Sequence, residues 1–466
     1  MPVAPVPPGR FMDVLSAAQA EEFERTIERG RTLLAGRVVW NVNSTARGGG
    51  VAEMLASLLA YTRGAGIDAR WVVISGDAGF FKVTKRIHNM LHGAPGDGEG
   101  LGDGDRMVYE RTAAANSEEI DRLLKPGDVV LLHDPQTAGL IGPVRALGAR
   151  VVWRCHVGLD EPNELAREAW QFLLPYVREA ESVVFSRDAF IWEGIDLGRV
   201  TVIPPSIDAF SAKNQDMTSE NVSAMLRAAG VEPGSPDGGA VFVREDGTPC
   251  RVDRRVDLSG SAPLPPEVPA LVQVSRWDRL KDPLGVLRAF GDGVAPHGDA
   301  HLVLAGPSVA AVSDDPEGAE VLEEVAAFRD GLREDVRERV HLLSLPMDDI
   351  EENAAIVNAL QRRARVVAQK SLAEGFGLTV AEAMWKARPV VGSRVGGIRE
   401  QIEDGETGVL VDPRDLPGFA RAVGRLLADP AGTAAMGKRA REEVRQMFLG
   451  PRHLRQYVDL FERLLA

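Results

Sequence analysis

Short apolar runs alternate with longer amphipathic stretches along most of the chain. In the first half, the apolar runs predict strands at residues 37–42, 71–75, 128–133, 151–153, 183–186 and 200–203. In the second half, they predict strands at 271–274, 301–305, 340–343, 366–368, 390–392 and 408–411. The stretches between them carry apolar residues at helical spacing, most clearly over 51–59. Strands that alternate with helices in this way predict an α/β protein with parallel, doubly wound sheets.

Length and composition narrow the class of protein. With 466 residues, the chain is long enough for two domains of about 200 residues each. The net charge of −14 argues against binding to nucleic acid or to anionic membranes. No apolar run approaches the length of a membrane span, and the proline-rich start lacks the features of a signal peptide. Cys155 and Cys250 have no metal-ligand spacing, and two thiols cannot form a disulfide framework, which fits a reducing cytoplasm. Together these features lead us to expect a cytoplasmic protein without a membrane anchor.

One segment of the second half departs from this alternation. Residues 231–268 are rich in glycine, proline and charge, and the runs 240–243 and 251–258 within them flank the turn 245–248. This pattern predicts a β-hairpin. We interpret 231–268 as a surface insertion in the second domain.

The stretch 366–386 carries the strongest candidate chemistry. A buried strand leads into a turn in which Gly375 and Gly377 flank Phe376, and a helix follows from Leu378 and Thr379. A glycine turn that opens a helix leaves backbone N–H groups without partners and places the positive end of the helix dipole at one point. Such a helix start is suited to binding a phosphate group.

Two carboxylates bracket this turn, Glu374 before it and Glu382 within the helix, with seven residues between them. Beside an anion site, a carboxylate is suited to accept hydrogen bonds from neutral hydroxyls, such as those of a sugar or ribose. Thr379 and Glu382 also fit a capping box, which would give Glu382 a purely structural role.

Further candidates follow other predicted strands. Arg276 and Lys281 come directly after the strand 271–274, where two cations can converge on one anion or lie in a solvated loop. Asp134 follows the strand 128–133, at the carboxyl edge where open α/β sheets bind ligands. Arg154 and His156 follow 151–153, and His156 could instead be a hydrogen-bonded structural histidine.

A glycine loop lies between the first strand and its helix. It contains Gly49 and Gly50, yet it matches neither the G-x-G-x-x-G pattern nor a Walker A motif. The loop could bring its backbone close to a phosphate or sugar, or could simply allow tight packing of the helix.

The two glutamates, the two glycines and the Leu-Thr start of the helix together resemble the E-x7-E signature of the retaining GT-B glycosyltransferases. The strings 43–53, 133–140, 153–160, 202–208 and 369–380 further resemble the trehalose glycosyltransferring synthases within that class, over about residues 40–445. The insertion 231–268 is longer than that family leads us to expect. The resemblance implies a GT-B fold, in which two Rossmann-like domains face each other across a cleft. It implies an N-terminal acceptor-side domain over 1–212, a donor domain over 213–450 and a C-terminal helix, 451–466, that packs back on the first domain.

The resemblance also implies roles for the candidate residues. The catalytic residues would be Glu374, Arg276, Lys281 and His156. The donor would be bound by Gly49, Gly50, Arg276, Lys281, Glu374, Gly375, Phe376, Gly377, Leu378, Thr379 and Glu382. The acceptor would be bound by Asp134, Arg154 and His156.

The implied activity is transfer of glucose, with retention, from a nucleoside-diphosphate glucose to free glucose, which yields α,α-trehalose. A related transferase with another sugar donor or acceptor, or a nucleotide-sugar-binding protein without activity, is the alternative. Small sugars and nucleotide sugars are the expected partners, a homodimer is compatible with the resemblance, and no cofactor is required. The sequence is compatible with Mg²⁺ but implies neither Mg²⁺ nor another metal.

Overall fold

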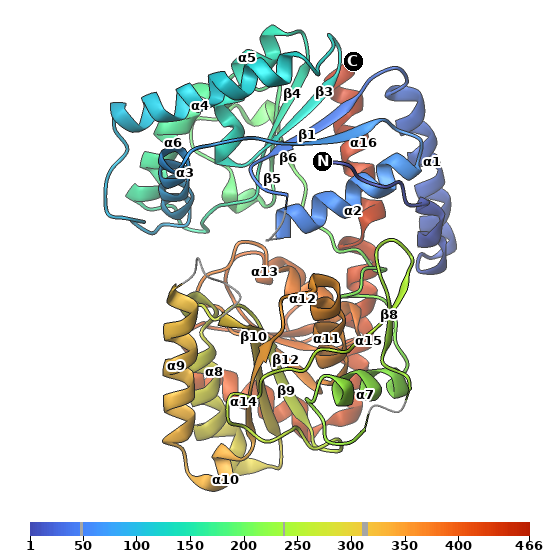
Figure 1. Ribbon diagram of the computed structural model, residues 1–466, viewed down its shortest axis with the longest axis vertical. Coiled ribbons are helices and arrows are strands. Elements are labelled where there is room, and N and C mark those ends of the chain that lie inside the picture. The colour runs from blue at the N-terminus through green and yellow to red at the C-terminus, as the bar shows by residue number, and fades with distance from the viewer. Residues whose placement is uncertain (47–49, 236–237, 310–315) are drawn as a thin grey trace. The chain divides into compact units, whose positions relative to one another are not determined.

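The computed structural model describes residues 1–46, 50–235, 238–309 and 316–466 (Figure 1). The chain forms two compact units. The first comprises Met1–Ser206 together with Phe448–Ala466, and the second comprises Ile207–Met447. The chain leaves the first unit within the proline-containing segment 204–208 and returns to it just before the last helix.

The first unit is built on a six-stranded parallel sheet with strand order β2-β1-β3-β4-β5-β6. Its strands are β1 (Val39–Asn43), β2 (Ala69–Val73), β3 (Val129–His133), β4 (Arg150–Cys155), β5 (Ser182–Phe185) and β6 (Val200–Val202). Its helices are α1 (Ala17–Leu33), α2 (Gly50–Gly64), α3 (Ala78–Leu91), α4 (Asp103–Asp121), α5 (Ile141–Ala146), α6 (Glu164–Val177) and α16 (Gly450–Leu465). The central strands β1 and β3 are buried along their whole length, as parallel strands covered on both faces must be.

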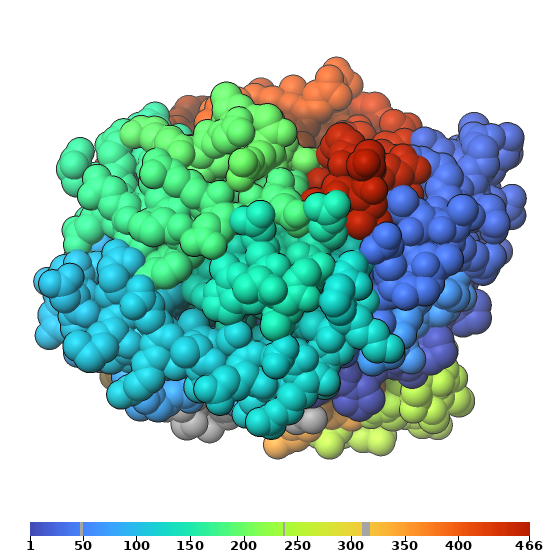
Figure 2. Space-filling model, turned by 90° about the horizontal axis from the view of Figure 1, so that it is seen from above, coloured from blue at the N-terminus to red at the C-terminus, as the bar shows by residue number. Residues whose placement is uncertain are grey.

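The C-terminal helix α16 belongs to the first unit. Tyr457, Leu460 and Phe461 pack on the face of the sheet that carries Val39 and Leu131. On its other side, α16 is joined to α1, because Arg29 donates to Asp459 and Glu462 at 2.6–3.0 Å. In Figure 2 the dark red spheres of α16 accordingly lie beside the blue spheres of the N-terminal segment.

The second unit has its own six-stranded parallel sheet, with strand order β11-β10-β9-β12-β13-β14. Its strands are β9 (Ala270–Val274), β10 (His301–Pro307), β11 (Val340–Leu345), β12 (Val366–Gln369), β13 (Val390–Ser393) and β14 (Gly408–Val411). Its helices are α7 (Ser219–Ala228), α8 (Pro283–Ala289), α9 (Pro316–Asp330), α10 (Glu334–Arg337), α11 (Ile350–Arg363), α12 (Leu378–Trp385), α13 (Ile398–Gln401), α14 (Leu416–Ala428) and α15 (Pro430–Met447). All twelve strands predicted for the two sheets are present, with ends displaced by one or two residues.

Each sheet has a point at which the strand order reverses direction. In the first unit this switch point lies between β1 and β3, and in the second it lies between β9 and β12. Open α/β sheets bind ligands at the carboxyl ends of the strands beside such a point. The strand order therefore directs attention to the residues that follow β1, β3, β9 and β12.

The insertion 231–268 is docked firmly on the second unit. Its predicted hairpin is present as the antiparallel pair β7 (Val241–Val243) and β8 (Pro249–Arg251), although the second strand lies at 249–251 and not at the predicted 251–258. Beyond the hairpin, Asp257 and Ser344 exchange backbone hydrogen bonds of 2.8 and 3.1 Å, so the insertion covers the outer edge of β11. An edge strand covered in this way cannot pair with another chain at that position.

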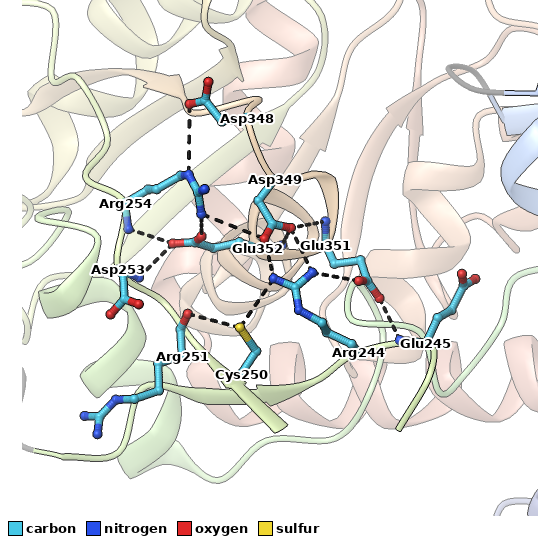
Figure 3. Close-up of polar contacts among 10 residues, drawn as sticks. All are labelled: Arg244, Glu245, Cys250, Arg251, Asp253, Arg254, Asp348, Asp349, Glu351 and Glu352. Carbon is cyan, nitrogen blue, oxygen red and sulfur yellow. Dashed lines mark hydrogen bonds and ion pairs between the residues drawn. The ribbon is translucent and has the colours of Figure 1, made fainter. Parts of the chain in front are cut away.

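Acidic residues at the start of α11 hold the same insertion. Figure 3 shows Arg244 and Arg254 directed toward the carboxylates of Asp349, Glu351 and Glu352. The buried Glu352 also accepts the backbone N–H groups of residues 253 and 254, at 2.7 and 2.6 Å. Asp349 is the N-cap of α11 as well, because it accepts from the backbone of residues 351 and 352. Charge-assisted bonds to a helix start are stabilising, so the insertion is an integral part of this unit.

No helix in the described ranges is long and apolar enough to cross a membrane.

Candidate active site

The switch point of the second sheet brings Lys281 and Glu374 together. Lys281 ends the short 3₁₀ turn Arg279–Lys281 that follows β9, and Glu374 lies in the turn that follows β12. The lysine Nζ donates to both carboxylate oxygens, at 2.8 and 2.6 Å. The lysine side chain is 19% exposed and the glutamate side chain 10% exposed, so the pair is largely buried yet reachable. The sequence predicted both residues for one site but did not predict that they would pair.

Glu374 has further donors besides the lysine. The Gln369 amide donates to it at 3.2 Å and the Ser371 hydroxyl at 3.1 Å. A carboxylate held by this many donors is a weak nucleophile, because its lone pairs are already engaged. The arrangement suits a group that orients and accepts hydrogen bonds.

Arg276 takes a different position from the one predicted for a converging pair of cations. It donates to Asp278 at 2.8 Å, and its side chain is 64% exposed. It therefore lies at the surface of the same strand edge, whereas Lys281 is largely buried beside Glu374.

The glycine turn begins α12 without a side-chain cap. Gly377 is the N-cap residue, with φ of +78°, a conformation that suits glycine. The amide of Ala381 is bound by the Gln401 side chain at 3.0 Å, whereas the amides of Leu378 and Thr379 meet no acceptor in the described part of the chain. The predicted capping box of Thr379 is wrong, because glycine occupies the N-cap position and Thr379 lies inside the helix. A helix start without a side-chain cap has free backbone N–H groups that can bind an anion.

A second glycine position keeps the turn closed. Gly396 has φ of +48°, and a side chain there would collide with the carbonyl oxygen of Glu374. The next amide, that of Gly397, donates to the Gly375 carbonyl at 2.8 Å, and the Gln401 amide donates to that of Phe376 at 2.6 Å. The loop after β13 thus braces the turn that carries Glu374.

Glu382, within α12, does not contact Lys281 or Glu374 but belongs to a separate cluster of polar side chains. Its carboxylate is 3.6 Å from Lys213 Nζ, and its backbone carbonyl accepts from Lys386. Lys386 also donates to Asn214 and Gln361, at 3.0 and 2.7 Å. Burial lowers the pKa of the Lys386 ammonium well below its ordinary value. The donor-binding role predicted for Glu382 stays a prediction.

The switch point of the first sheet brings Asp134 and His156 together. The Asp134 carboxylate accepts the backbone N–H of His156 at 2.8 Å. Asp134 itself has φ of +65° and ψ of 175°, a strained backbone conformation for a residue with a side chain. Trp153 Nε1 donates to its carbonyl at 3.1 Å, which helps to hold that conformation. Strain retained at the end of a central strand is a common mark of a functional position.

The two groups titrate abnormally. Burial raises the pKa of the Asp134 carboxyl to about 6. Burial, together with the charge of Arg154 and the neighbouring His133, lowers the pKa of His156 well below its ordinary value. His156 is therefore neutral at physiological pH, so one of its ring nitrogens donates a hydrogen bond and the other accepts one.

Arg154 does not join these residues in the way that its predicted acceptor role requires. It is fully buried, and its guanidinium donates to His453 at 3.0 Å, to the Tyr457 hydroxyl and to the Ile203 carbonyl at 3.0 Å. Successive residues of a strand face opposite sides of the sheet, and Arg154 faces the side covered by α16. We therefore assign Arg154 to the attachment of α16 and correct its predicted role in binding the acceptor.

Two predicted residues come from the glycine loop. Gly49 lies outside the described residues. Gly50 is the exposed first residue of α2. Their predicted approach to the donor phosphate stays a prediction.

Two residues that hydrogen bonds link to His156 are not among those predicted for the site from the sequence. Asn41 and His133 are buried polar residues of the apolar strands β1 and β3, and a hydrogen bond joins them. A polar residue inside a buried strand is uncommon, and that was the available signal.

The described residues contain no group of three His, Cys, Asp or Glu side chains placed to hold a metal ion.

Comparison with known proteins defines the class. A solved Escherichia coli structure, described as trehalose-6-phosphate bound with UDP-2-fluoro glucose, has a TM-score of 0.67 at 14% identity, covering 92% of this chain and 99% of that one. A family described as glycosyl transferases group 1 matches residues 268–429. With its two parallel-sheet α/β units, the protein has the GT-B fold, and the group 1 match agrees with the glycosyltransferases that share this fold.

The family follows from closer relatives. The trehalose synthase N-terminal domain family matches residues 41–192. A trehalose synthase of Rubrobacter xylanophilus is 36% identical over 444 residues, which cover 93% of each chain. One of Pyrococcus horikoshii is 35% identical over 455 residues, which cover 98% of this chain and 96% of that one. The chain belongs to the trehalose synthase family, and the resemblance to trehalose synthases seen in the sequence is confirmed.

Proposed function

We propose that the protein transfers glucose, with retention of configuration, from a nucleoside-diphosphate glucose to free glucose and so forms α,α-trehalose. Its membership of the trehalose synthase family supports the product. The nucleotide sugar bound in the Escherichia coli structure of the same fold supports the class of donor. In this proposal the second unit binds the donor and the first unit binds the acceptor.

The observation that carries the proposal is the Lys281–Glu374 pair beside the uncapped start of α12. Negative charge develops on the leaving diphosphate as the bond to glucose breaks. Lys281 and the amides of Leu378 and Thr379 are the fixed positive groups that would stabilise it. Arg276, at the surface of the same edge, would join them when the donor is bound. Glu374 would then exchange its lysine contact for hydroxyls of the transferred glucose.

Retention is proposed to occur by attack from the face that the diphosphate leaves. The alternative is a double displacement, which needs a carboxylate nucleophile close to the reacting carbon. Glu374 is the carboxylate at this position, and its oxygens are engaged by the donors of Lys281, Gln369 and Ser371. In the proposed route the departing phosphate oxygen takes the proton of the attacking glucose hydroxyl. His156 and Asp134, at the switch point of the first sheet, would position the acceptor and the transferred sugar. In the proposed route no step involves a metal ion.

The direct test is product analysis. The purified chain is incubated with free glucose and, in separate reactions, UDP-, ADP- and GDP-glucose, with glucose 1-phosphate as a comparison donor and EDTA present in a parallel set. We expect a non-reducing disaccharide from at least one nucleotide sugar, insensitive to EDTA. Formation of another glycoside, or binding of the donor without any transfer, would replace the proposal with one of the two alternatives.

A further inference from the structure

A row of hydrogen-bonding side chains crosses the first sheet and ends at His156. It begins at Asn41 of β1, which is 5% exposed, and continues through His133 of β3, which is fully buried. The Asn41 Oδ1 atom lies 3.0 Å from His133 Nε2. On the far side of that ring, His133 Nδ1 lies 3.3 Å from His156 Nε2. Strands β1 and β3 and the residue that follows β4 thus contribute one side chain each to a continuous chain.

With the amide oxygen of Asn41 facing His133, the protons of this row have one direction. Burial, with a smaller contribution from the charge of Arg154, lowers the pKa of His133 to about 3, so its ring is neutral and carries a single N–H. The amide oxygen of Asn41 can only accept, so the proton of His133 lies on Nε2. Its Nδ1 then has a lone pair and accepts from His156 Nε2. His156 in turn has its proton on Nε2 and a lone pair on Nδ1.

We propose that Asn41 and His133 are positioning residues that fix His156 in the tautomer with an unprotonated Nδ1, ready to accept a hydrogen bond from a sugar hydroxyl. Within the described residues, Nδ1 of His156 has no hydrogen-bond partner of its own. The inference deepens the proposed function and rests on it for the statement that a sugar lies at His156.

The backbone at His156 is fixed independently of its ring. Its N–H is held by Asp134, whose strained conformation Trp153 helps to maintain. The ring is therefore anchored at the backbone on one side and at Nε2 on the other. Side chains locked in this way keep a catalytic site in its productive geometry without reorganisation during the reaction.

The charged surroundings favour the same state. The positive charge of Arg154 disfavours protonation of His133, His156 and His453 alike. Asp134 is the acidic group at the site, and it is bonded to the His156 backbone rather than to the ring. An imidazole that stays neutral and has one defined tautomer offers its lone pair to every substrate molecule that arrives.

The test reads the tautomer directly. The full chain is labelled with ¹⁵N-histidine, and long-range ¹H–¹⁵N spectra are recorded at neutral pH without any substrate; the His156→Gln variant identifies the His156 signals. We expect Nε2 to be protonated and Nδ1 unprotonated. A proton on Nδ1 of His156 in the wild-type spectrum would overturn the proposal, even if no variant could be purified.

Asn41→Leu removes the terminal acceptor at similar volume, and Asn43→Leu is its matched control. Asn43 is on the same strand and equally buried, but it bonds to Trp71 and not to a histidine. We expect Asn41→Leu to change the His156 pattern to a mixture of tautomers and to lower kcat by about tenfold or more, as loss of a supporting hydrogen bond does elsewhere. Asn43→Leu should leave the His156 pattern unchanged. An unchanged pattern in Asn41→Leu would refute the inference. Because the spectra need no substrate, they remain decisive if the protein proves to make another product.

Discussion

Replacing Lys281 with alanine tests the donor site most directly. The change removes the buried cation that contacts both oxygens of Glu374, at 2.8 and 2.6 Å, beside the open start of α12. If Lys281 stabilises the leaving diphosphate, its loss should lower kcat by about 10²–10³, equivalent to about 2.7–4 kcal/mol of transition-state stabilisation.

The variant should remain folded. Glu374 keeps its hydrogen bonds from Gln369 and Ser371, and its side chain is partly reached by water. We expect a loss of unfolding free energy of about 1–2 kcal/mol, which is small against the stability of an ordinary domain. The activity loss can therefore be separated from unfolding.

Arg279→Ala is the matched control. Arg279 lies on the same 3₁₀ turn, but its guanidinium pairs with Glu324 at 2.7 Å and is half exposed. Because exposed ion pairs contribute little, its activity should stay within about twofold of wild type.

The assay is the initial rate of disaccharide formation at saturating donor and acceptor, with thermal unfolding followed by circular dichroism for all three proteins. Folded Lys281→Ala protein with activity within about tenfold of wild type would refute the role given to Lys281, since one lost preorganised donor costs more than that. Equal losses in Lys281→Ala and Arg279→Ala would instead indicate a general effect on the turn.

Three further predictions concern stability. Arg154→Ala should lower the free energy of unfolding by about 3 kcal/mol, because it leaves His453 and the Tyr457 hydroxyl on α16 without this donor; an unchanged urea midpoint would contradict this. Glu352→Ala should cost about 2 kcal/mol by stripping two backbone N–H groups of their partner, and limited proteolysis should then cut within 231–268; a wild-type cleavage pattern would argue against it. The third prediction concerns the loss of folding stability at acidic pH. Folded His133 has a pKa of about 3, so below pH 6.5 only the unfolded chain takes up its proton, and stability falls by about 1.4 kcal/mol per pH unit. The raised pKa of Asp134, about 6, acts in the opposite sense, since its contribution grows as the pH falls from 6 toward 4. His133→Asn should flatten the fall of the melting temperature between pH 7 and 5, and an equal slope in both proteins would refute the assignment.

The sequence by itself determined the architecture and the location of the candidate chemistry. Strand and helix periods are local properties, so the apolar runs identified all the strands of both sheets. The turn around Glu374 is also a local feature, because its glycines and the start of the following helix lie within a few residues of one another in the sequence. Charged residues after strands indicated the correct edge of each sheet, since parallel strands end together.

Only the tertiary structure decided which of these residues meet. Lys281 and Glu374 are far apart in the chain and come together because β9 and β12 are neighbours across the switch point. Arg154 faces α16, a helix from the other end of the chain, and no local pattern indicates that partner. The row from Asn41 to His156 depends on the alignment of β1, β3 and β4. The docking of the insertion depends on the free edge of β11, with which Asp257 pairs. Local periodicity specifies the elements, whereas strand order and register, which depend on the packing of the whole chain, specify the contacts between them.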